Sequence, residues 1–299
     1  MTDSTDPTST EVPATTPVTV PTGDGDLSCF QFGTGVPEVL AIHGITGNHL
    51  AWAGLHQALP DTPMLTPDLR GRGASSDLPG PFGMERHAAD CALALRQTTD
   101  RPVVVVGHSM GAFVAITLAV QYPELVERLV LVDGGAPLPK PPGMAHTPLD
   151  EVAHAALGPA AHRLSRTFTS REEYVAQFRE HPALRDHWSP AVEAYAAYDL
   201  TGEPPHLHAR TSSEAMLADF AELFVGGANE QVSARLQHRA EVLRAPHGLL
   251  DKSPLYPPGY LDAWATTLPE VRITEVGDVN HYTIVLGEGV QRVARSVLD

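Results

Sequence analysis

The sequence predicts an α/β fold with a mostly parallel, twisted sheet flanked by helices and one helical insertion. Residues 103–106 and 129–132 are short apolar runs without polar/apolar alternation, which is typical of strands buried on both faces. Helical segments separate such runs in a repeating order, as in a parallel sheet. That order is interrupted once, because residues 136–239 contain no run of this kind.

Residues 18–135 and 240–299 form the expected core. Its first part should contain a hairpin (18–20 and 27–32, turning at Gly23-Asp24-Gly25), strands at 39–42, 64–66, 103–106 and 129–132, and helices at 49–59, 84–97 and 111–121. Its second part should contain strands at 241–245 and 271–276 and helices at 260–267 and 281–297.

Residues 136–239, here called the cap segment, should cover the C-terminal edge of the sheet. We expect no strand there, and three helices that open at Ser170, Ser189 and Ser213, residues typical of helix N-termini. Insertions of this kind have fewer buried contacts than a sheet. We therefore expect the cap segment to move and to control access of a substrate.

Composition narrows the classes of partner. The 299 residues carry a formal net charge of −16, which argues against nucleic-acid or membrane partners and favours a small-molecule substrate. Residues 1–17 are rich in Ser, Thr and Pro and lack the features of a secretory signal, so we expect a disordered tail and a cytoplasmic protein. Cys29 and Cys91 should be free thiols. The scattered histidines suggest no metal site, and the sequence leaves the oligomeric state open.

Residues 107–111 (GHSMG) join a buried strand directly to a buried helix. The turn is so tight that side chains at Gly107 and Gly111 would collide with neighbouring backbone, and it raises Ser109 above the end of the strand. The pattern is that of a nucleophile elbow, with the positive end of a helix beneath the serine. The alternative is a glycine-rich turn with an incidental serine.

Four motifs, in this order along the chain, resemble the α/β-hydrolase superfamily, in its capped, serine-nucleophile form: His43-Gly44, residues 68–73 (DLRGRG), residues 107–111 and residues 280–283 (NHYT). The resemblance spans residues 18–298 and implies the α/β-hydrolase fold, with an all-helical cap and no cofactor. It also implies that His43 and the Asp and Arg residues of 68–73 organise loops.

A serine hydroxyl needs a base, and His281 is the expected one because it follows the last strand, as the family's histidine does. His108 should point away from the Ser109 hydroxyl. The tetrahedral intermediate needs backbone N–H donors, which Met110 and Ile45 should supply.

Two aspartates compete for the acid that orients His281. Asp251 lies after the penultimate strand and before His281, in the order that the family shows. Asp133 directly ends the strand that follows the nucleophile, and some family members take their acid from there. We prefer Asp251 and keep Asp133 as the alternative.

The expected function is cofactor-independent hydrolysis of a carboxylic ester, thioester or lactone of a small apolar substrate through an acyl-enzyme. Cleavage of a C–C bond or of a lactone is the alternative on the same fold, and a non-catalytic ligand receptor is a third possibility. Aromatic residues of the cap segment could line the pocket or belong to the core; the candidates for the pocket are Trp188, Tyr195 and Phe220.

Overall fold

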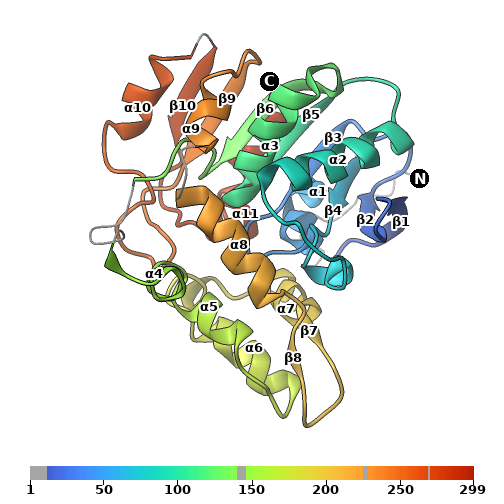
Figure 1. Cartoon of the computed structure of the whole chain (residues 1–299), viewed down its shortest axis with the longest axis vertical. Helices are drawn as coiled ribbons and strands as arrows, with labels where there is room; N and C mark the ends of the chain where they lie inside the picture. Colours follow the sequence, from blue (N-terminus) through green and yellow to red (C-terminus); the bar gives the residue numbers. More distant parts are fainter. Residues whose placement is uncertain (1–11, 140–145, 225–227, 269) are drawn as a thin grey trace, which may run out of the picture.

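The computed structural model describes residues 12–139, 146–224, 228–268 and 270–299, and its main feature is an eight-stranded sheet (Figure 1). The strand order is β1-β2-β4-β3-β5-β6-β9-β10. Strand β1 pairs with β2, and β2 with β4, in antiparallel fashion, whereas all later pairs are parallel. The bounds are β1 Thr15–Pro21, β2 Asp26–Phe32, β3 Val39–Ile42, β4 Met64–Pro67, β5 Val103–His108, β6 Val126–Val132, β9 Ala240–Arg244 and β10 Val271–Glu275.

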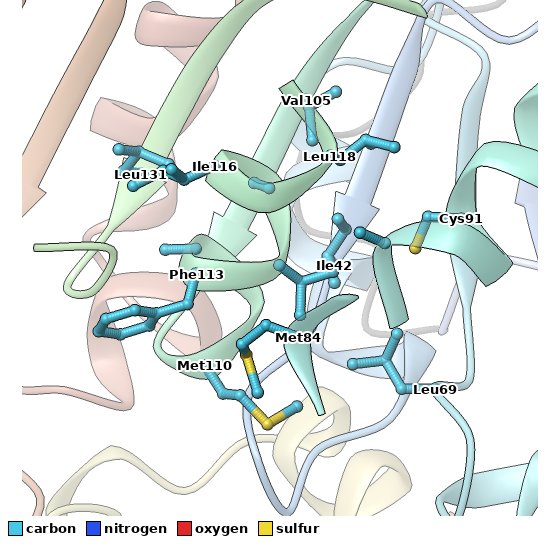
Figure 2. Packing of buried hydrophobic residues seen from close by; sticks show 14 of the residues in the cluster. Ile42, Leu69, Met84, Cys91, Val105, Met110, Phe113, Ile116, Leu118 and Leu131 are labelled. Atoms are coloured by element: carbon cyan, nitrogen blue, oxygen red, sulfur yellow. The ribbon is translucent and has the colours of Figure 1, made fainter. Parts of the chain in front are cut away.

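Helices cover both faces of the sheet, as the unbroken apolar strands require. Val103 and Val105 belong to one hydrophobic cluster and Val104 and Val106 to another, because successive strand residues point to opposite faces. Helices α2 (Met84–Thr98) and α3 (Met110–Gln121) pack on the first face, as Figure 2 shows for Met84, Met110, Phe113 and Ile116. Helices α1 (Ala53–Ala58), α11 (Thr283–Leu286) and α12 (Val290–Leu298) pack on the second face. Helix α10 (Tyr260–Ala265) contributes Leu261 to the first cluster.

The cap segment lies between β6 and β9 in the chain; most of it lies beyond the end of the sheet, whereas its last helix packs on α3 of the core (Figure 1). Its helices are α4 (Leu149–Leu157), α5 (Pro159–Leu164), α6 (Arg171–Arg179), α7 (Pro190–Tyr198), α8 (Ser213–Phe224) and α9 (Ala228–Ser233). Ser170 and Ser189 cap α6 and α7 as expected, by accepting hydrogen bonds from the backbone N–H groups of Glu173 and Val192.

Four predictions about the elements need correction. The cap segment has more than three helices, and it is not free of strands, because β7 (Leu200–Thr201) pairs with β8 (His208–Ala209). Two-residue strands are too short to leave an alternating pattern in the sequence. The expected tail ends too late, because β1 already begins at Thr15; residues 1–11 lie outside the described residues. The last helix is divided into α11 and α12.

No helix in the described ranges is long and apolar enough to cross a membrane. Cys29 and Cys91 are both free, as predicted, and both are buried.

Candidate active site

Ser109 lies on a strained turn between β5 and α3. Its backbone has a φ of 55° and a ψ of −121°, a combination that residues other than glycine rarely adopt. A Cβ atom on Gly107 would lie 2.3 Å from the carbonyl oxygen of Gly111, and one on Gly111 would lie 2.2 Å from that of Ile42. The turn therefore requires both glycines, and it presents Ser109 at the C-terminal end of the sheet, as the sequence predicts.

Asp133 is placed beside Ser109 by strand register. His108 pairs with Val132 in the parallel β5–β6 ladder, so the next residue of each strand emerges at the same edge. The backbone N–H of Ser109 donates to the carbonyl of Val132 (2.9 Å), and that of Asp133 to the carbonyl of Leu243 (2.7 Å). Asp133 is fully buried, and its Oδ1 accepts a hydrogen bond from the backbone N–H of Ala245 at 3.1 Å. Asp133 is thus held rigidly at three adjacent strand ends.

His281 lies in the turn before α11 and contacts Asp133. Its Nδ1 is 2.6 Å from Asp133 Oδ2, and its ring is 3% exposed. The carboxylate therefore fixes the tautomer with the proton on Nδ1, which leaves Nε2 as an acceptor. His108 supports the same turn, because its Nε2 donates to the carbonyl oxygen of His281 at 2.8 Å. Burial keeps the pKa of His108 well below its usual value, so that this donor is a neutral ring.

The preferred assignment of Asp251 to His281 is wrong in its geometry, and the alternative, Asp133, makes the contact. Asp251 Oδ1 accepts from the side-chain amide of Asn280 (3.2 Å) and contacts His247 Nδ1 (3.2 Å). Its side chain is 41% exposed. Asp251 therefore contacts the residue before His281 and not His281 itself. The physical reason is that β9 ends at Arg244, so that Ala245, not Asp251, meets Asp133 at the sheet edge.

Residues 43–47, here called the oxyanion loop, pass close to Ser109. A Cβ atom on Gly44 would lie 3.1 Å from the Cβ of Ser109. The carbonyl oxygen of Gly44 accepts from the backbone N–H of Gly47 (3.0 Å) and from His43 Nδ1 (2.8 Å). Since the trans peptide points its N–H opposite to its carbonyl, these bonds fix the direction of the Ile45 N–H. Met110 opens α3, where a backbone N–H has no partner within the helix.

His43 organises the oxyanion loop from a fully buried position. Its Nε2 accepts from the backbone N–H of Leu69 (3.0 Å), so its Nδ1 carries the proton that is donated to Gly44. Burial lowers the pKa of His43 to about 4, which keeps the ring neutral. The expectation that His43 organises a loop matches these contacts.

The residues of the 68–73 motif tie the loop to the cap segment. Arg72 is fully buried; its Nε donates to the carbonyl oxygen of Ile45 (3.0 Å), and its Nη1 lies 2.6 Å from Asp219 Oδ2 on α8. Asp68 Oδ2 accepts from the hydroxyl of Tyr198 on α7 (2.6 Å). Burial acts to raise the pKa of Asp68, but hydrogen bonds from His49 and Tyr198 and nearby histidines hold it below its usual value.

A narrow cavity opens at Ser109, and it is lined by the oxyanion loop and Ala51, by His108 and His281, and by Leu157, Tyr195, Leu249, Tyr282, Val285 and Leu286. Its volume is about 30 Å³. We call it the site cavity.

Of the predicted pocket residues, only Tyr195 lines the site cavity. Trp188 lies under the guanidinium of Arg179, 4.8 Å away, and Phe220 belongs to the core beside Phe224. Sequence reasoning missed Tyr282, although its position directly after His281 was the available signal. Within the described ranges, no group of three or more His, Cys, Asp or Glu side chains could hold a metal ion.

Comparisons with known proteins point to one family. A family model described as the alpha/beta hydrolase fold matches residues 37–288. Lipase LipV of Mycobacterium tuberculosis is 40% identical over 109 residues, which are 36% of this chain and 41% of the lipase. The sn-1-specific diacylglycerol lipase ABHD11 of Mus musculus is 35% identical over 113 residues, 37% of this chain and 34% of that lipase. The chain thus matches less than half of the length of these relatives.

Solved structures agree on the fold. The crystal structure of E-2-(acetamidomethylene)succinate hydrolase matches with a TM-score of 0.77 at 20% identity, over 95% of this chain and 98% of that chain. A thermophilic esterase from Thermogutta terrifontis matches with a TM-score of 0.64 at 22% identity, over 95% of this chain and 97% of that one. At these identities the likeness concerns the fold alone.

Proposed function

Because the chain belongs to the family with the alpha/beta hydrolase fold, as its match over residues 37–288 establishes, we propose that it is a serine hydrolase that cleaves a carboxylic ester through an acyl-enzyme. The observation that carries the proposal is the contact of His281 Nδ1 with the buried Asp133 at 2.6 Å, at the edge where the strained turn presents Ser109. His281 and Ser109 line the same cavity.

The acylation step follows from this arrangement. The Ser109 Oγ attacks the ester carbonyl carbon while its proton passes to His281 Nε2. The Asp133 carboxylate stabilises the imidazolium that forms. Collapse of the tetrahedral intermediate breaks the bond to the alcohol oxygen, which takes the proton from His281. Water then attacks the acyl-enzyme by the same route, releasing the acid and restoring the Ser109 hydroxyl.

The backbone N–H groups of Ile45 and Met110 would donate hydrogen bonds to the negatively charged oxygen of the tetrahedral intermediate. The fixed peptide between Gly44 and Ile45 supports this assignment, because a donor that is already oriented does not have to reorganise during the reaction. Loss of one such donor costs roughly two to three orders of magnitude in kcat in enzymes of this kind.

The small volume of the site cavity, about 30 Å³, favours a short acyl group. Leu157 and Tyr195 of the cap segment form part of the wall, so that movement of this segment would enlarge the cavity. We therefore propose a small, largely apolar acyl group and a cap segment that opens for entry.

A panel of p-nitrophenyl esters with acyl chains of increasing length tests this function. We expect steady hydrolysis with a preference for short chains, and an initial burst of nitrophenol equal to the enzyme concentration if breakdown of the acyl-enzyme is slower than its formation. An amide and a thioester of the preferred acid define the bond type. Absence of turnover on the whole panel would contradict the proposal and favour a ligand-binding role.

A further inference from the structure

Two tyrosines line the site cavity, and their hydroxyls have no hydrogen-bond partner among the described residues. Tyr195 lies on α7 and is 6% exposed, and Tyr282 directly follows His281 and is half-buried. Both line the cavity together with Ser109. Hydrogen bonds reach the backbone of both residues, but among the described residues neither hydroxyl has a hydrogen-bond partner. Neither oxygen is sealed off from the cavity, since neither is among the buried unpaired polar atoms of the described residues.

Other buried tyrosines of the chain use their hydroxyls within the protein. The Tyr174 hydroxyl donates to Asp199 (2.5 Å), that of Tyr198 to Asp68 (2.6 Å), and that of Tyr256 to the carbonyl of Ala136 (2.8 Å). Buried phenol hydroxyls usually find such partners, because an unsatisfied one loses its hydration without compensation. Tyr195 and Tyr282 differ from this group in that their hydroxyls have no partner among the described residues while both residues line the cavity, so a bound molecule can accept their hydrogen bonds.

The surroundings of the pair favour an uncharged acceptor. Burial raises the pKa of both phenols, and the Arg163 guanidinium partly opposes that rise, so both hydroxyls are firm donors at neutral pH. The charge of Arg163 is already offset by Asp199 at 3.3 Å, and Asp133 lies behind His281. Among the described residues that line the cavity there is no Lys or Arg to pair with a carboxylate. Leu157, Leu249 and Leu286 add apolar surface to the wall.

We propose that Tyr195 and Tyr282 donate hydrogen bonds to a second, uncharged carbonyl oxygen of the substrate. The site then takes esters that carry a further ketone, ester or amide group a short apolar distance from the bond that is cleaved. This inference rests on the proposed ester hydrolysis and adds the class of substrate. Tyr195 and Tyr282 determine specificity, whereas the chemical step belongs to Ser109 and His281.

Matched ester pairs test the inference. On the acyl side, p-nitrophenyl 4-oxopentanoate is compared with p-nitrophenyl pentanoate; on the alcohol side, 4-oxopentyl acetate is compared with pentyl acetate. Each kcat/KM is divided by the rate of hydroxide-catalysed hydrolysis, which removes differences in intrinsic reactivity. We expect the wild type to prefer the oxo ester of one pair by about tenfold, which corresponds to one to two net hydrogen bonds.

The double variant Tyr195→Phe/Tyr282→Phe should lose that preference, so that its ratio of kcat/KM values falls to about one. It should fold, because neither hydroxyl is bonded within the protein, and circular dichroism and melting temperature verify this. Tyr174→Phe is the matched control, since it removes a hydroxyl that is bonded within the cap segment, and it should keep the preference.

Three outcomes would overturn the inference: no preference in either pair, a preference that persists in the double phenylalanine variant, or a preference for the corresponding carboxylate, mono-p-nitrophenyl succinate. If the wild type hydrolyses neither ester of either pair, the proposed function fails; hydrolysis without preference removes the inference alone.

Discussion

Asp133 and Asp251 both follow a strand of the sheet, but their carboxylates have different surroundings. Asp133 is fully buried and uses one oxygen for the backbone N–H of Ala245 and the other for His281. Asp251 is partly exposed and holds Asn280 and His247. An acid that orients a histidine must touch the ring and be held in place. By this criterion Asp133 is the partner of His281, and Asp251 stabilises the turn in which His281 lies.

We expect Asp133→Asn to lower kcat by about three to four orders of magnitude, or roughly 4–5.5 kcal/mol of transition-state stabilisation. The amide keeps the shape but removes the charge that stabilises the imidazolium. Asp251→Asn, the matched control, should lose about tenfold or less and show its effect mainly in melting temperature. Steady-state kinetics and thermal unfolding of both variants measure these effects. A large loss of kcat in Asp251→Asn and a small one in Asp133→Asn would instead assign the acid that orients His281 to Asp251.

The sequence could predict Ser109 and His281 but not the choice between the two aspartates. The elbow is local, because two glycines and a serine between an apolar strand and an apolar helix determine its geometry. The contact of Asp133 depends on the parallel register of β6 with β5 and β9, which brings together residues that are distant in the sequence. No local sequence pattern predicts that register.

At the scale of elements, helix α8 is joined to the oxyanion loop through one guanidinium. Arg72 contacts Asp219 on α8 with Nη1 and the carbonyl of Ile45 with Nε. Asp219 is itself fully buried and also accepts from the backbone N–H of Gly83 (2.7 Å) and from His87 Nε2 (2.9 Å). The buried ion pair of Arg72 with Asp219 therefore connects α8 to the carbonyl of Ile45, which belongs to the peptide after the Ile45 N–H.

We expect Asp219→Asn to lower kcat roughly tenfold or more with a smaller change in KM, because Arg72 would no longer be held against the Ile45 carbonyl and Ile45 would shift together with its N–H. Affinity for a boronic acid, which forms a tetrahedral adduct with a serine, should fall in parallel. Asp199→Asn is the control: it disrupts another buried ion pair, that with Arg163, which lies within the cap segment. It should lower stability and leave boronate affinity within about threefold.

Arg72→Lys gives a second test of this coupling if Asp219→Asn fails to fold. Lysine keeps a positive charge opposite Asp219 but lacks the second donor that reaches Ile45. The coupling predicts a loss of kcat here as well. Equal effects of Asp219→Asn and Asp199→Asn on kcat and boronate affinity would contradict it.

Over the whole molecule, apolar periodicity in the sequence predicted the repeating strands and helices of the core. For the cap segment it predicted a helical insertion but not the individual elements. Apolar runs buried on both faces report parallel strands directly, as residues 103–106 do. In the cap segment, β7 and β8 have two residues each, and the buried pair of Arg163 with Asp199 stabilises the segment from within. Polar networks of this kind depend on tertiary contacts. The site cavity, whose wall comes from both the core and the cap segment, was unpredictable for the same reason.

Buried neutral histidines should make the whole molecule sensitive to mild acid. Burial lowers the pKa values of His43 and His181 from 6.5 to about 4. As the pH falls, the two histidines are protonated in the unfolded chain before they are protonated in the folded protein. Each histidine therefore contributes to the free energy of unfolding above pH 6.5, and this contribution is lost as the pH falls toward 4. We expect His181 alone to account for about 2 kcal/mol of unfolding free energy between pH 6.5 and about pH 5.

Urea unfolding at several pH values measures this loss. His181→Gln should flatten the decline by about one proton, whereas replacement of the exposed His206 by Gln should leave it unchanged. The buried Asp219, whose pKa is held at about 2 by Arg72 and His87 against the effect of burial, acts only at lower pH. An unfolding free energy that stays constant from pH 7 to about pH 5 would contradict the expectation.

The most direct test of the central claim is mass spectrometry of the protein after reaction with a fluorophosphonate, which labels an activated serine. We expect a single adduct, on the peptide that contains Ser109, in the wild type and none in a folded Ser109→Ala variant, which should also lose essentially all ester hydrolysis. An adduct on another residue, or an alanine variant with full activity, would contradict the assignment of Ser109 as the nucleophile.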